Sequence, residues 1–175
     1  FKSDKLVGWL DKTETRGYLW VVGEVQGGVI NIVQPGTEDE YIGLAVSRPR
    51  TKLQVNISEP LPSVTLEIWA EAEIGEVQGR LDPFKDPKTI LAIERRLEEA
   101  IKNEVEKALT KVQKELNSDI FGFGMMIWRK HPKVWLEKYR AVWDEVFPVL
   151  PVEIKVNVAL RRPGLTTRSS GVFSE

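Results

Sequence analysis

The sequence contains no cysteine among its 175 residues and only one histidine, His131. The lack of cysteine excludes disulfide bonds, thiolate catalysis and cysteine-ligated metals. A single histidine excludes a histidine-rich metal site, and a catalytic histidine also needs a partner group. His131 precedes Pro132, so we interpret it as a capping or surface residue at a helix break. We therefore expect no catalytic residue, no metal and no cofactor.

Long apolar runs and a strong charge imbalance are missing as well. No stretch approaches the roughly 20 apolar residues that a membrane-spanning helix needs. The 25 basic and 26 acidic side chains leave a formal net charge of −1, so no overall field favours nucleic acid or an anionic membrane. Arginines cluster near the end of the chain without an aromatic platform, and we expect no nucleic-acid binding.

The sequence has neither a signal peptide nor a starting methionine, since it opens at Phe1. We expect it to be a piece of a longer protein. Apolar residues make up 42% of the chain and charged residues 29%, a balance typical of a globular domain. The prediction is one α+β domain over residues 1–165, followed by a flexible polar tail over residues 166–175.

Strands are predicted where apolar and polar residues alternate, because one face of such a strand is buried and the other is wet. In Val64 to Ile74 the even-numbered residues face inward, whereas Glu67, Trp69, Glu71 and Glu73 face outward. The other predicted strands are Lys5 to Leu10, Val29 to Val33, Lys52 to Ile57 and Val152 to Leu160.

Helix signals occupy the remaining segments. Asp11 and Glu14 form a D-x-x-E capping pattern, which begins a short helix that ends at Gly23. Asp86-Pro87 begins a long helix with an apolar stripe at steps of three and four, on which Glu98 is placed to pair with Lys102. Ser118 is predicted to cap the next helix, and a third helix follows Pro132.

The order of these elements, strands followed by helices and then a last strand, predicts an α+β fold. We expect an antiparallel or mixed β-sheet with one long helix and two shorter helices packed on one face.

Three of the six tryptophans fall between Ser118 and Pro148. Large aromatic residues at helical spacing are typical of packing or docking surfaces. Gly122 and Gly124 lack the G-x-G-x-x-G pattern and the Walker lysine of nucleotide loops, so a tight turn or close helix packing explains them better. The residues that we expect to contact a partner are Trp69, Phe121, Phe123, Arg129 and Trp135.

The outward glutamates of Val64 to Ile74 leave an alternative open. Residues i and i+2 on a strand lie about 6.6 Å apart, a separation that paired catalytic carboxylates also use. Glu67, Glu71 or Glu73 would then act in an extracytoplasmic enzyme on carbohydrate or cell-wall substrates. A third possibility, direct binding of a small nutrient, needs a pocket of about 300 Å³ or more.

Four blocks of the sequence resemble one family in the family's own order: residues 1–23, which include LVGWL and ETRG, residues 111–124 (KVQKELNSDIFGFG), the spacing of Arg129, Pro132, Trp135, Trp143 and Phe147, and residues 152–165 (VEIKVNVALRRPGL). Together they are similar to the C-terminal domain of the Ger(x)C lipoproteins, the C subunits of the nutrient germinant receptors of endospore-forming bacteria.

The resemblance implies a parent protein with a signal peptide and a lipid-bearing cysteine, anchored to the outer face of the spore inner membrane. It implies two integral membrane partners, the A and B subunits of the receptor, and a role in germination without catalysis. The hypothesis is therefore a non-enzymatic scaffold or docking module for receptor assembly.

Overall fold

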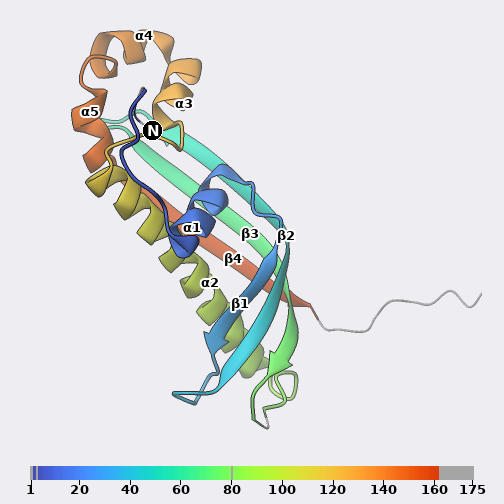
Figure 1. Ribbon diagram of the computed structural model, residues 1–175. Coiled ribbons are helices and arrows are strands. Elements are labelled where there is room, and N and C mark those ends of the chain that lie inside the picture. The colour runs from blue at the N-terminus through green and yellow to red at the C-terminus, as the bar shows by residue number, and fades with distance from the viewer. Residues whose placement is uncertain (1, 3, 80, 162–175) are drawn as a thin grey trace, which may run out of the picture.

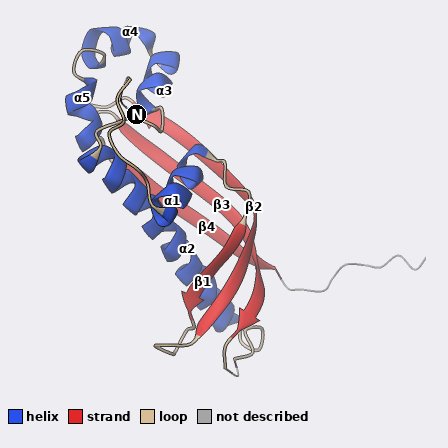
Figure 2. Ribbon diagram, in the orientation of Figure 1, coloured by secondary structure: helices blue, strands red, loops and turns tan. Residues whose placement is uncertain are grey.

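The computed structural model describes residues 2, 4–79 and 81–161, so the tail predicted over residues 166–175 lies outside the described part. Helices and a four-stranded mixed sheet, in the order β1-β2-β3-β4, make up the fold (Figure 2). Strands β1 (Gly28–Val33), β2 (Tyr41–Asn56) and β3 (Ser63–Val77) pair antiparallel, and β4 (Val152–Arg161) pairs parallel to β3. This arrangement confirms the predicted α+β class with a mixed sheet.

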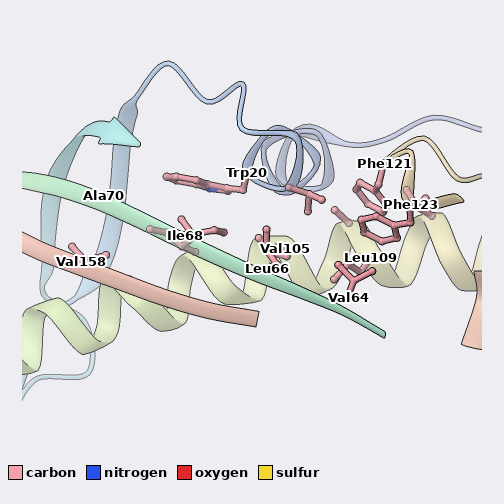
Figure 3. Packing of buried hydrophobic residues seen from close by; sticks show 14 of the residues in the cluster. Trp20, Val64, Leu66, Ile68, Ala70, Val105, Leu109, Phe121, Phe123 and Val158 are labelled. Atoms are coloured by element: carbon pink, nitrogen blue, oxygen red, sulfur yellow. The ribbon is translucent and has the colours of Figure 1, made fainter. Parts of the chain in front are cut away.

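The alternation of apolar and polar residues along β3 determines which face of the sheet forms the core. Val64, Leu66 and Ile68 are fully buried, whereas Trp69 on the opposite face is 39% exposed. The buried side chains meet the apolar stripe of helix α2 (Pro87–Thr110), as Figure 3 shows for Leu66 and Val105. One face of the sheet is therefore covered by helices, and the other, which we call the polar face, carries the glutamates of β3.

Two strand predictions needed correction. The segment Lys5 to Leu10 is not a strand, because it lies against the end of the helical layer, where a Cβ on Gly8 would come within 2.5 Å of a Leu116 methyl carbon. Strand β2 begins at Tyr41, well before the predicted Lys52, and Pro49 is accommodated at a β-bulge between Ser47 and Arg50.

The long helix begins where it was predicted to, and the next helix does not. The Asp86 side chain accepts a hydrogen bond from the Lys88 amide at 2.9 Å and caps α2, which continues as a π-helical segment, η1 (Lys111–Glu115). Helix α3 (Phe123–Lys130) follows, but Asp119 rather than the predicted Ser118 accepts hydrogen bonds from its first amides.

The predicted third helix is broken into short pieces, which Figure 1 shows at the far end of α2. A break at Val142, whose φ is −117°, separates the first two pieces from the last two. The pieces are α4 (Pro132–Val134), the π-helical η2 (Trp135–Tyr139), α5 (Trp143–Val146) and the 3₁₀ turn η3 (Phe147–Val149).

Helix α1 (Lys12–Val22) has the predicted capping box, with Asp11 and Glu14 each accepting a hydrogen bond from the other's amide at 2.7 Å, and it ends at the left-handed Gly23. Gly17 faces α2 so closely that a Cβ there would lie 2.0 Å from the Glu104 carbonyl oxygen and 2.8 Å from the Ala108 Cβ. The absent side chain is therefore what lets the two backbones touch.

A buried carboxylate fixes the same crossing. Glu104 is only 6% exposed, and it accepts a hydrogen bond from Arg16 Nε at 2.7 Å and one from Trp20 Nε1 at 3.2 Å. A second bond, from Arg16 Nη2, completes a two-pronged ion pair. Because a buried charge is costly without partners, this network holds α1 in one register on α2.

Polar side chains of α2 also reach both edges of the sheet. Arg96 Nη1 donates to the Val33 carbonyl of β1 at 2.7 Å. On the other edge, the Val158 and Leu160 amides of β4 donate to Glu98 and Glu94 at 3.0 and 2.9 Å. The predicted Glu98–Lys102 pair is wrong, because Glu98 serves the strand and Lys102 pairs with Glu106 at 3.8 Å. Side chains of α2 thereby form hydrogen bonds with backbone groups at both edges of the sheet. Unpaired backbone groups at a sheet edge could otherwise pair with a strand of another molecule.

We expect Gly17→Ala to destabilise the protein, although alanine favours a helix by about 1 kcal/mol over glycine. The new methyl group would collide with backbone on α2, and such overpacking typically costs about 1–3 kcal/mol or more. The midpoint of chemical denaturation should fall. Thr15→Ala, at an exposed position of the same helix, is the matched control and should change stability by less than about 0.5 kcal/mol. An unchanged midpoint for Gly17→Ala would contradict the close crossing.

Candidate functional site

The helical end carries an aromatic depression of about 350 Å³, which we call the tryptophan pocket. Met125 and Trp128 at its edge are 48% and 46% exposed. The residues that line the pocket are Asp119, Gly122, Gly124, Met125, Trp128, Trp135 and Trp143. It is an exposed apolar hollow built from α3, η2 and α5.

Local structure holds the pocket rigid. The Asp119 carboxylate accepts hydrogen bonds from the Gly124 amide at 2.7 Å and from Trp143 Nε1 at 3.1 Å. Gly122 takes a left-handed φ of 77°, and a Cβ on Gly124 would lie 2.9 Å from ring atoms of both Trp135 and Trp143. The turn and the close packing expected of these two glycines are therefore both present.

Two of the predicted contact residues are inside the core, and that part of the prediction was wrong. Phe121 and Phe123 are 6% and 0% exposed, and their rings stack with centroids 5.2 Å apart. Trp135 is partly buried and lines the pocket, packing edge-on against Trp143 with centroids 5.3 Å apart. Arg129 is exposed on α3 but does not line the pocket.

Met125 and Trp128 lie in the region from Gly122 to Trp135 that the sequence predicts as a contact surface, but they were not among the residues singled out in it. A helix beginning at Ser118 places Phe121 on the same face as Met125 and Trp128. Because α3 begins only at Phe123, Phe121 lies in the turn before the helix and points into the core. Gly122, which takes a left-handed φ of 77° directly before α3, was the signal in the sequence for the later start.

A second hollow, of about 650 Å³, lies on the polar face around Trp69, and we call it the Trp69 basin. Trp69 stands between Arg50 of β2 and Asn157 of β4 in the strand register. The residues that line the basin are Arg48, Arg50, Trp69, Ala70, Glu71, Asn157, Val158 and Ala159. Trp69, predicted to contact a partner, is thus accessible and flanked by polar groups.

The three glutamates of the alternative prediction are not equivalent. Glu71 accepts from Arg161 Nη2 at 2.5 Å and from Arg48 Nη1 at 3.1 Å. The hydrogen bond from Arg161, followed by the charges of both arginines, lowers the pKa of Glu71 below its ordinary value. A glycosidase acid needs the opposite shift. Glu67 lies 3.8 Å from Lys52 Nζ, and Glu71 is the one member of this trio that lines the basin.

Residues 2, 4–79 and 81–161 bring together no group of three or more His, Asp or Glu side chains suited to a metal ion. His131, in this same part of the chain, is exposed. None of the helices described by the structure combines the length and the apolarity that crossing a bilayer requires.

We expect Arg161→Gln to raise the pKa of Glu71 toward its ordinary value of 4.5, and to raise it more than Arg48→Gln does, because the Arg161 hydrogen bond is the larger cause. Since folding lowers this pKa, Glu71 contributes stability above about pH 4.5 that is lost as the pH falls through the folded-state value. Carboxyl carbon shifts followed by NMR titration measure the pKa. Lys52→Gln is the control, and an equal response to all three changes would contradict the assignment.

Comparison with known proteins gives consistent matches. Residues 1–164 match the model of the family described as spore germination B3/GerAC-like, C-terminal. The chain is 33% identical to spore germination protein KC of Bacillus subtilis (strain 168) over 167 residues, which cover 94% of this chain and 40% of that protein. It is 27% identical to spore germination protein B3 of the same organism, covering 83% of this chain and 38% of the relative.

A solved structure shares the fold. The crystal structure of the GerBC protein superposes with a TM-score of 0.76 at 25% identity, over 90% of this chain and 48% of that one. The chain thus spans about 40% of the length of the curated relatives and about half of GerBC. The family match, the relatives and the shared fold agree, and the chain belongs to the spore germination B3/GerAC-like C-terminal family.

Proposed function

We propose that this chain is a non-enzymatic docking module of a spore nutrient germinant receptor and that the tryptophan pocket is its contact with another receptor subunit. The names of the relatives, all spore germination proteins, support the process. The observation that carries the docking role is an exposed apolar hollow, edged by Met125 and Trp128, on a stiff base. The partners in this proposal are the integral membrane A and B subunits.

The pocket has the properties of an interface anchor site. Tryptophan is among the residues that most often dominate binding energy, because its large ring is desolvated with little loss of conformational freedom. A hollow of about 350 Å³ is large enough to receive one or two apolar side chains of a partner. Because Asp119 and the packed Trp135 and Trp143 hold the floor, little ordering cost remains on this side of the contact.

Basic residues surround the exposed end of α3. Arg129 and Lys130 are exposed at the end of α3, and Lys133 is exposed on the next turn. A charged rim of this kind mainly accelerates association with an acidic partner and adds less to final affinity. Arg129 therefore keeps its predicted contact role as a rim residue rather than as an anchor.

In this proposal the whole protein is held at the outer face of the spore inner membrane by a lipid on its N-terminal part, as the family resemblance implies. A lipid anchor holds the protein that carries it close to integral membrane partners. Tethering raises the effective concentration of the contact, so the pocket needs only modest affinity of its own.

We expect Trp128→Glu in the full-length protein to slow nutrient-triggered germination about tenfold or more, because a carboxylate at the pocket edge cannot be desolvated against an apolar partner. The measurement is the fall in optical density of spores whose own copy of the gene is replaced by the variant. Trp128 is 46% exposed, so the fold and the protein level should be preserved.

Leu91→Glu is the matched control, since Leu91 is 54% exposed on α2 and lies outside the pocket. It should leave germination at the wild-type rate. Met125→Glu supplies a second change at the pocket edge. Normal germination with both pocket variants present at wild-type level would show that this surface is not the contact.

A further inference from the structure

The polar face carries a row of acidic side chains along β3 that is interrupted at one cross-strand rung. The central strand β3 presents Glu67, Trp69, Glu71 and Glu73, each opposite residues of β2 and β4 in the register. Two of the carboxylates have close cationic partners, Lys52 for Glu67 at 3.8 Å and two arginines for Glu71. At the rung between these two glutamates, the indole of Trp69 stands where the row of acids would otherwise continue.

The cation on that rung, Arg50, has no counter-ion. Arg50 lies opposite Trp69 on the same face, and among the described residues its guanidinium is exposed and forms no ion pair or hydrogen bond. On the other side of Trp69, Asn157 supplies an amide that both donates and accepts hydrogen bonds. The rung therefore combines an exposed indole with a free guanidinium on one neighbouring strand and an amide on the other.

The neighbouring bulge strengthens this arrangement. Arg48 takes a left-handed φ of 48°, which is uncommon for a residue with a side chain, and the register of β2 shifts between Ser47 and Arg50. Bulges of this kind redirect side chains, often next to functional sites. Here both Arg48 and Arg50 line the basin, and Arg48 with Arg161 neutralises Glu71, so the carboxylate of Glu71 does not compete for Arg50.

We propose that the Trp69 basin binds a ligand that carries a carboxylate next to a flat or apolar group. The carboxylate takes the place of the missing acid and pairs with Arg50, the guanidinium being suited to two-pronged carboxylate binding. The apolar part of the ligand lies on the Trp69 ring, and Asn157 fixes its orientation. The volume of about 650 Å³ is in the range of small-molecule sites.

This site is distinct from the tryptophan pocket, with which it shares no lining residue, and it does not depend on the docking proposal. The carboxylate has two possible sources, a free small molecule or an acidic side chain of a polypeptide. Both present the same chemistry to Arg50 and Trp69, and the experiment separates them.

The test titrates the whole 175-residue chain with 3-phenylpropionate and follows the Trp69 indole N–H by NMR, assigned with a Trp69→Phe variant. The neutral 3-phenylpropionamide is the matched ligand. We expect saturable binding of the acid in the millimolar range, at least about tenfold weaker binding of the amide, and at least about fivefold weaker binding of the acid to Arg50→Gln. Lys52→Gln, one rung away on the same strand and 56% exposed, should stay within about twofold of wild type.

A capped peptide, acetyl-Phe-Glu-amide, forms the second arm. Tighter binding of this peptide than of the free acid identifies a polypeptide carboxylate as the source, and weaker binding identifies a small molecule; either result requires Arg50. The proposal is overturned if no saturable change appears at Trp69 up to about 20 mM acid, which is well beyond the expected range. It is also overturned if acid and amide bind equally or if Arg50→Gln binds as wild type does.

Discussion

The contact between Gly17 of α1 and the Glu104 carbonyl of α2 is the constraint on which the helical layer depends, because it leaves no space for any other side chain. The buried Glu104 carboxylate then needs Arg16 and Trp20, which lie one residue before and three after that glycine. Trp20 in turn accepts a hydrogen bond through its carbonyl from Thr51 Oγ1 at 2.8 Å, which joins α1 to β2. The ETRG segment that suggested the family is thus explained by packing: the glutamate caps, the arginine pairs and the glycine permits contact.

Elements defined by local information could be predicted from the sequence. The capping box of α1, the Asp86-Pro87 start of α2 and the alternation of β3 and β4 each depend on residues within a few positions of one another, and all four were found as expected. The failures concern long-range contacts. Whether residues 5–10 form a strand depends on a sheet edge being near. The broken segment after Pro132 packs Trp135 and Trp143 on Gly124 of another helix, a contact that local sequence does not reveal.

The same distinction applies to the two candidate sites. The sequence placed Trp69 among glutamates on one face, but not the cations opposite, because those come from β2 and β4 and depend on a bulge and a register. At the helical end, a helix predicted from Ser118 placed Phe121 on one face with Met125 and Trp128. Because α3 begins only at Phe123, Phe121 is buried in the turn before it, while Met125 and Trp128 are exposed.

The charge placement on the polar face differs from that of a pair of catalytic carboxylates. Acid–base catalysis by paired carboxylates requires environments that separate their pKa values, with one acid kept protonated near neutral pH. On the polar face, cations lower the pKa of Glu71, while the other cation at this hollow, Arg50, is left unpaired within the part of the chain that the structure describes. Helix α2 meanwhile uses its own charges to satisfy both sheet edges, so the scaffold beneath is stiff. The ion pairs around Glu71 favour its ionised form, whereas an acid that donates a proton near neutral pH needs the opposite environment.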